Sequence, residues 1–257
     1  MSAFLNIIST KEDSSERIKL SQEDYVRVDD CLKEMSVLMS EIDYCLMLRQ
    51  NATELMEEIL YGSRSHDSVF NELNRKLMNL LNSFYAWIEF HESNYKDLFS
   101  RLKTKYYNDN FEYRLAYSLR KYTTHCSVCI SRITYDVLSE VECIQIVPKE
   151  LLDNSSYLNA IIKKDLQELE ANGEAIDLRL FLSKFLLVFE QFQDELWKQL
   201  IPKIGEKADR LRFITELLHD DRFVDIILEP DNGDSKSVVA VMLQFYEKIK
   251  SIKPPEE

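Results

Sequence analysis

The six consecutive residues from Arg120 to His125 combine the side-chain types that cleavage of RNA without a metal ion requires. Such cleavage needs a base for the ribose 2′-proton, a cation for the charge on the phosphate and an acid for the leaving oxygen. His125 can act as base or acid near neutrality, and the guanidinium of Arg120 stays charged and matches phosphate geometry. Lys121, Tyr122 and Thr124 add an ammonium and two hydroxyls that can bind the substrate. The segment therefore predicts a catalytic pair, Arg120 and His125, with these three residues binding substrate.

The five-residue spacing of Arg120 and His125 limits how their side chains can meet. In a helix this spacing is about 500° of rotation, which leaves the two residues about 140° apart. They do not share one narrow face. Arginine is long enough to curl toward His125 if the helix ends there, and a second copy of the chain can bring another pair into a shared cleft. The spacing therefore favours a homodimer with a composite site over a monomer.

The charge around the pair differs from the charge of the whole chain. The chain has a net charge of −13, which opposes indiscriminate binding of nucleic acid. Residues 96–132 instead hold eight cations and three carboxylates, a net charge of +5. Arg114 belongs to this basic strip and is predicted to bind the substrate beside the catalytic pair. A solvated helix face, paired with acids elsewhere in the fold, explains the same charge pattern.

Long helices are predicted to carry this segment. Apolar residues recur at steps of three and four from about residue 22 to residue 59, and Gly62 is expected to end that helix. A second helix is predicted over 68–107, with a break after its apolar first part. Short polar side chains at 108–110 indicate a turn, and a third helix follows over 111–125. The catalytic pair thus lies in the last turns of a helix that follows a long one.

The chain after the pair changes from a helical to a strand-like pattern. Residues 128–147 are rich in β-branched and aromatic types and predict a β-hairpin with its turn near Ser139, which Pro148 ends. A short helix is predicted over 157–170. A helix over 178–200 is apolar on most sides, so we expect it at the centre of the core.

The ends of the chain are predicted from weaker patterns. Residues 1–20 are mostly polar and are expected to be loosely held. Pro202 and Gly205 are expected to interrupt the central helix, and further helices fit residues 206–219 and 235–250. Glycine and proline are scarce in the whole chain, with four and five residues, which favours long helices.

The string Tyr117-x-Leu119-Arg120-x-Tyr122-x-x-His125 resembles the Arg-x4-His motif of the HEPN family, in particular uncharacterised bacterial members of that ribonuclease superfamily. Residues 74–84, with Asn74, Asn82 and Phe84, resemble the helix that precedes the motif in that group. The resemblance covers about residues 66–200. It implies a four- or five-helix bundle with the motif toward the end of one helix.

The resemblance also implies a function and a domain organisation. Many HEPN proteins are metal-independent endoribonucleases of toxin–antitoxin, abortive-infection or CRISPR-linked systems, so the expected protein is a homodimeric hydrolase of microbial defence or stress that acts on RNA. Arg120 would bind phosphate and His125 would act on the 2′-hydroxyl. The expected fold is mainly α: residues 1–65 form an N-terminal helical extension, 66–205 a HEPN-like bundle with an inserted β-hairpin near 128–147, and 206–257 C-terminal helices.

Other motifs of catalytic or metal chemistry are incomplete. The chain contains no glycine-rich phosphate loop. His91 begins a zinc-protease pattern, but Tyr95 stands where the second histidine belongs. Cys126 and Cys129 have the spacing of a zinc or redox pair, yet a fourth ligand and a redox setting are missing, which favours buried thiols beside the hairpin. We therefore expect neither a metal nor another cofactor.

Composition predicts a cytoplasmic protein. The five cysteines are an odd number, and the first residues lack the features of a signal peptide, so reduced thiols are expected. The most apolar stretch, residues 180–189, is interrupted by Ser183 and Lys184 and is too short to span a bilayer. No contact with a membrane is expected.

Two alternatives compete with the ribonuclease interpretation. Lys121 stands where HEPN members commonly have Asn, Asp or His, and a lysine cannot accept a hydrogen bond to orient His125. A non-catalytic HEPN-like module, used for dimerisation or for binding an antitoxin, an effector protein or nucleic acid, fits that departure. A helical scaffold outside the family would have Arg120 on its surface and His125 near a helix end, where histidine is favoured anyway.

Overall fold

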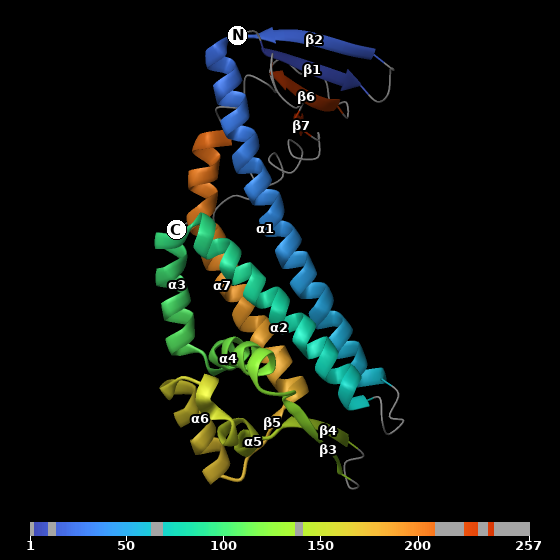
Figure 1. Ribbon diagram of the computed structural model, residues 1–257, viewed down its shortest axis with the longest axis vertical. Helices are drawn as coiled ribbons and strands as arrows, with labels where there is room; N and C mark the ends of the chain where they lie inside the picture. The colour runs from blue at the N-terminus through green and yellow to red at the C-terminus, as the bar shows by residue number, and fades with distance from the viewer. Residues whose placement is uncertain are drawn as a thin grey trace, which may run out of the picture. The chain divides into compact units, whose positions relative to one another are not determined.

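The computed structural model describes residues 3–9, 14–62, 69–136, 141–208, 224–230 and 236–238, and these residues are mainly helical (Figure 1). The helices are α1 (Gln22–Tyr61), α2 (Val69–Asn94), α3 (Lys96–Asp109), α4 (Phe111–His125), α5 (Pro148–Asp153), α6 (Ala160–Ala171) and α7 (Leu178–Ala208), with a 3-10 turn, η1, at Ser155–Tyr157. The strands are β1 (Ala3–Ser9), β2 (Ser14–Leu20), β3 (Ile130–Asp136), β4 (Val141–Ile146), β5 (Ile176–Asp177), β6 (Val224–Pro230) and β7 (Lys236–Val238). The predicted mainly α fold with a β-hairpin is confirmed.

The chain forms two compact units, one comprising Met1–Ser40 with Trp197–Glu257 and the other Glu41–Leu196. The units divide within helices α1 and α7, whereas the sequence predicts segment boundaries near residues 65 and 205. The first unit contains an antiparallel sheet with the strand order β2-β1-β6-β7. The second unit contains the Arg120–His125 segment.

The sheet of the first unit corrects the prediction for both chain ends. Residues 3–9 and 14–20 form β1 and β2 rather than a loosely held segment, and Lys236–Val238 is a strand where a helix was predicted over 235–250. Strand β1 pairs over its full length with its sequence neighbour β2 and also with β6, more than two hundred residues later, and a local pattern does not reveal this second partner. Residues 206–208 complete α7, and the rest of the predicted 206–219 helix lies outside the described residues.

Helices α1 and α2 form an antiparallel pair in the second unit. Lys76 Nζ lies 2.8 Å from Glu58 Oε2, and farther along the pair Asn51 donates to Ser83 Oγ at 3.2 Å. Residue numbers therefore rise along α2 as they fall along α1. Gly62 ends α1 as predicted, and its N–H donates to the carbonyl of Glu58.

Helix α7 supplies the centre of the second unit, as predicted from its sequence. The ring of Phe192 on this helix is fully buried. Its centroid lies 4.5 Å from the ring centroid of Tyr106, 5.2 Å from that of Trp87 and 5.3 Å from that of Phe99. The same ring contacts Tyr113 of α4 at 5.7 Å. These contacts join α7 to α2, α3 and α4 through aromatic edges and faces.

One prediction about helix breaks is confirmed and another is wrong. The break expected within the helix predicted over 68–107 lies at Tyr95, where the backbone leaves helical geometry (φ −136°, ψ 38°). The break lets Phe99 and Leu102 of α3 turn into the core, where both are buried. Helix α7 continues past Pro202 and Gly205 to residue 208, since a proline removes one backbone donor and can bend a helix without ending it.

Candidate functional site

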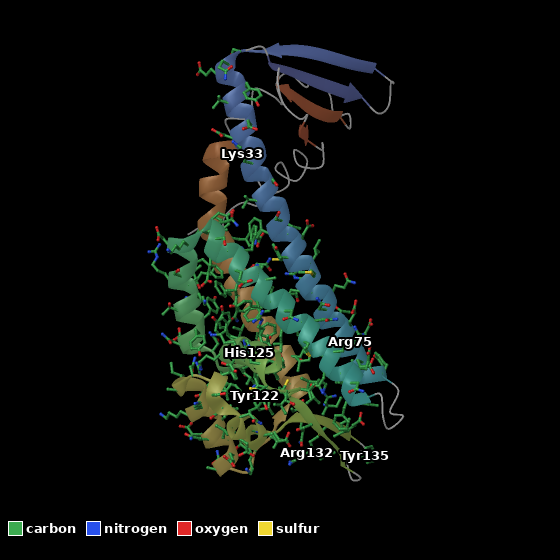
Figure 2. All side chains as sticks on the ribbon, in the orientation of Figure 1. Lys33, Arg75, Tyr122, His125, Arg132 and Tyr135 are labelled. Carbon is green, nitrogen blue, oxygen red and sulfur yellow. The ribbon has the colours of Figure 1, made fainter. Side chains whose placement is uncertain are left out.

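Helix α4 carries the predicted site and has the bounds that the sequence predicts. Its inner face is apolar apart from two polar side chains, and its buried residues are Tyr113, Arg114, Leu115, Ala116, Ser118, Leu119 and Tyr122. This face packs against α2, α3, α6 and η1. The outer positions, from Tyr117 to His125, leave cationic and aromatic side chains at the surface. Figure 2 shows Tyr122 and His125 along this helix.

His125 is exposed at the last residue of α4. Its ring stacks on that of Tyr157 with centroids 4.8 Å apart and planes inclined by 13°. Within the described chain the imidazole nitrogens have no hydrogen-bond partner, and Tyr157 is itself 46% exposed. The ring is therefore held by one face while its nitrogens stay open to a substrate.

Arg120 lies on an aromatic ring rather than on a carboxylate. Its guanidinium carbon is 4.1 Å from the ring centroid of Tyr85 on α2, which is cation–π geometry. Its Nε is buried and has no hydrogen-bond partner among the residues described here. The positive charge of Arg120 is thus positioned but not neutralised.

The structure does not bring Arg120 and His125 of one chain together. Arg120 contacts Tyr85 of α2, and His125 contacts Tyr157 of η1. These different neighbours agree with the angle of about 140° that five helical residues impose. Thr124, between them, is exposed, and its hydroxyl donates to the carbonyl of Arg120 at 2.8 Å. One chain therefore presents the two groups separately.

Arg114 is engaged inside the protein. It is only 9% exposed, and its Nε lies 3.0 Å from Asp165 Oδ2 on α6. Its Nη1 donates to the carbonyls of Tyr107 and Asn108 at the end of α3. Arginine donors at a helix C-terminus satisfy carbonyls that lack helical partners. We therefore leave Arg114 out of the candidate site.

Tyr122 is also part of the core. It is 2% exposed, and its hydroxyl donates to the carbonyl of Glu150 at 3.4 Å. Burial raises the pKa of this phenol above its usual value. The side chain connects α4 to α5, so we also leave it out of the substrate-binding set.

The basic strip is only partly free of counter-charges. Three of its eight cations face carboxylates that are distant in sequence or in another helix; the pairs are Lys103–Glu92 at 2.6 Å, Lys105–Glu195 at 2.7 Å and Arg114–Asp165 at 3.0 Å. Lys121 instead lies 4.9 Å from the ring centroid of Tyr117 and has no carboxylate partner within the described ranges. Arg120 and Lys121 are therefore adjacent cations without neutralising partners.

Asn74 joins α2 to the segment that leaves α4, a role that the sequence analysis missed. Its buried Oδ1 accepts from the N–H groups of Cys129 and Ile130 at 3.2 and 2.9 Å. Its Nδ2 donates to the carbonyls of Ile130 and Phe70, both at 2.9 Å. The amide thereby fixes where β3 begins, five residues after His125. A polar residue inside the apolar stripe of α2, beside Leu73, is the signal that identifies it.

The cysteines after His125 differ in environment. Cys126 is exposed and Cys129 is buried. Burial raises the pKa of Cys129 to about 12, so this side chain is a neutral thiol near neutrality. Across the part of the chain that the structure describes, no group of three or more His, Cys, Asp or Glu side chains is placed to hold a metal ion. A search of the same residues finds no helix that is long and apolar enough to cross a membrane.

Comparisons of the chain with protein-family models, with curated proteins and with solved structures find no match. The chemistry of the site is therefore argued from its own residues. These are an exposed imidazole on the ring of Tyr157, a guanidinium on the ring of Tyr85 and the ammonium of Lys121.

Proposed function

We propose that this protein is a metal-independent endoribonuclease of HEPN-like type, in which His125 transfers protons and Arg120 binds phosphate. One observation supports the proposal most directly: the imidazole of His125 is held by Tyr157, while its nitrogens have no hydrogen-bond partner among the residues that the structure describes. A buried imidazole bonded only to the backbone would have argued against this role. The expected setting is microbial defence or stress in the cytoplasm.

The proposed reaction uses the ribose itself as the nucleophile. A ring nitrogen of His125 takes the proton of the 2′-hydroxyl, and the 2′-oxygen attacks the adjacent phosphorus. The bond from phosphorus to the 5′-oxygen breaks, and that oxygen takes up a proton. The products are a 2′,3′-cyclic phosphate and a 5′-hydroxyl. Arg120 stabilises the charge on the phosphate oxygens during the attack.

Dimerisation is part of the proposal because the two groups of one chain lie apart. Arg120 on Tyr85 and His125 on Tyr157 have no common neighbour. A homodimer that pairs two α4 helices would offer the phosphate Arg120 from one chain and His125 from the other. A second His125 would then be available as the acid for the leaving oxygen.

RNA cleavage in the presence of EDTA tests the proposal. Wild-type protein should cleave an unstructured RNA and leave the corresponding 2′-deoxy oligonucleotide intact, because the latter lacks the nucleophile. His125→Ala should lower the rate by at least about 100-fold. Ser127→Ala, two residues away and also exposed, is the matched control and should cleave like wild type. Equal cleavage by wild type and His125→Ala would assign the activity to something other than this site.

A non-catalytic binding module is the second candidate, and the position of Lys121 favours it. Lys121 lies on the ring of Tyr117 and cannot accept a hydrogen bond that would orient His125. Such a module would bind RNA or a protein partner, such as an antitoxin or an effector, without cleaving RNA. Binding of RNA by wild type together with absence of cleavage under all metal-free conditions would select this candidate.

A further inference from the structure

Three helices contribute to a surface that we name the cation–tyrosine patch. It consists of Tyr85 from α2, Lys103 and Tyr107 from α3, and Tyr117, Arg120 and Lys121 from α4, all of them partly exposed. The ring of Tyr117 is at its centre, with centroids 5.9 Å from those of both Tyr85 and Tyr107. Residues far apart in sequence thus form one continuous aromatic surface.

The tyrosine rings hold the cations of the patch. Lys103 Nζ and Lys121 Nζ each lie 4.9 Å from the ring centroid of Tyr117, and the guanidinium of Arg120 lies over Tyr85. A cation–π contact at a partly exposed site is weak, but it restrains the side chain that makes it. Unlike a carboxylate, an aromatic ring leaves the positive charge available. Arg120 and Lys121 therefore present restrained cations that can still bind an anion, whereas Lys103 pairs with Glu92.

The composition of the chain makes unpaired cations here informative. The chain has 45 acidic and 32 basic side chains, so carboxylates are in excess. Lys103 has such a partner in Glu92, at 2.6 Å. Arg120 and Lys121 have none within the described ranges, although carboxylates are in excess. Two cations without carboxylate partners in an acidic chain are available to an anionic ligand.

We propose that the cation–tyrosine patch, which does not include His125, binds the backbone phosphates and bases of single-stranded RNA. This inference rests on the proposed function because it takes RNA as the ligand. Cations that follow the backbone, together with aromatic rings that stack on bases, are what single strands require. A duplex hides its base faces, so the rings of Tyr85 and Tyr117 would gain little from it. An acidic peptide would use the cations but not the aromatic stacking.

Binding rather than cleavage tests the patch. The probe is a fluorescent, unstructured 2′-O-methyl RNA, which lacks the free 2′-hydroxyl and stays intact, and its anisotropy is measured with the full chain over a series of salt concentrations. Lys121→Gln should weaken binding several-fold and lower the dependence of log Kd on log salt by about one. Lys164→Gln is the matched control, because its side chain is 77% exposed on α6 and distant in sequence from the patch, and its affinity should stay within twofold of wild type.

The aromatic part of the patch has its own comparison. Tyr117→Leu removes the stacking surface and should weaken binding by about tenfold, whereas Tyr117→Phe, which keeps a ring beneath both lysines, should weaken it by clearly less. Circular dichroism melts of each variant check that the fold is retained. Equal affinity of Lys121→Gln, Lys164→Gln and wild type would overturn the proposal. So would tighter binding of a polyglutamate peptide than of RNA, or tighter binding of a duplex.

The outcomes separate this inference from the proposed function. Cleavage that depends on His125, combined with patch variants that bind normally, would reject the patch and keep the ribonuclease. Weakened binding by the patch variants, combined with no cleavage, would keep the patch and reject the ribonuclease.

Discussion

The amide of Asn74 offers a quantitative test of how α2 holds the segment that follows His125. Asn74→Ala removes the partners of three backbone groups, namely the N–H of Cys129 and both the N–H and the carbonyl of Ile130. At about 1 kcal/mol for each hydrogen bond the loss is about 3 kcal/mol, and the better helix propensity of alanine returns about 0.5 kcal/mol. We therefore expect the free energy of unfolding to fall by about 2.5 kcal/mol.

Urea denaturation followed by far-ultraviolet circular dichroism measures this change. The midpoint should fall while the slope with urea stays the same, because the surface exposed on unfolding is unchanged. Asn82→Ala is the matched control, since Asn82 is exposed on the same helix and has no side-chain bond within the described residues. It should be neutral or more stable by up to about 0.5 kcal/mol. If Asn74→Ala is as stable as Asn82→Ala, the amide does not hold this segment.

Three further predictions concern the rest of the second unit. Arg114→Ala should lower the free energy of unfolding by about 3 kcal/mol in urea titrations, because it breaks a partly buried ion pair and two hydrogen bonds to carbonyls of α3; a change below about 1 kcal/mol would return Arg114 to the substrate-binding candidates. Burial, and second the hydrogen bond to Glu195, raise the pKa of Tyr106 in the folded protein to about 12. Above pH 10 the unfolded chain therefore loses the phenol proton before the folded chain does, and the free energy of unfolding falls between pH 10 and 12. The free energy of unfolding of Tyr106→Phe should fall by about 2–3 kcal/mol less than that of wild type over this pH range. Parallel curves of unfolding free energy against pH for the two proteins would contradict the prediction. Iodoacetamide should label exposed Cys126 before buried Cys129 in the native protein, read by peptide mass spectrometry, and equal rates would contradict the burial.

Helix α4 was predictable because its signals are local. Leu115, Leu119 and Tyr122 repeat at steps of four and three, and the polar turn ending at Asn110 marks its start. The hairpin β3–β4 was predictable for the same reason, since its strands are close in sequence and rich in β-branched residues. In both cases the residues that determine the element lie close together in the sequence.

The features that the sequence analysis did not foresee depend on partners that are distant in sequence. Strand β1 pairs with β6 as well as with β2, and Arg114 pairs with Asp165, which lies 51 residues later. The net charge of residues 96–132 was counted correctly, but counting cannot show that Lys103 meets Glu92 across two helices. A local pattern gives the type of a side chain, whereas the fold decides whether its charge is available.

The candidate site was predicted only in part for a similar reason. The helical spacing correctly implied that Arg120 and His125 point in different directions. It did not reveal that Tyr85 and Tyr157 would receive them, because these tyrosines come from other elements. Neither tyrosine belongs to a motif that identifies it as the partner of a cation or an imidazole.

The rings also bear on how His125 would be oriented in the proposed enzyme. A residue after Arg120 that accepts a hydrogen bond could orient the imidazole, but Lys121 is held by Tyr117, four residues before it on the same helix face. It cannot also orient His125. The parallel stack with Tyr157 restrains the imidazole plane without occupying either nitrogen. In the proposed enzyme, the orientation of His125 therefore depends on Tyr157, and Lys121 is left to bind the RNA backbone.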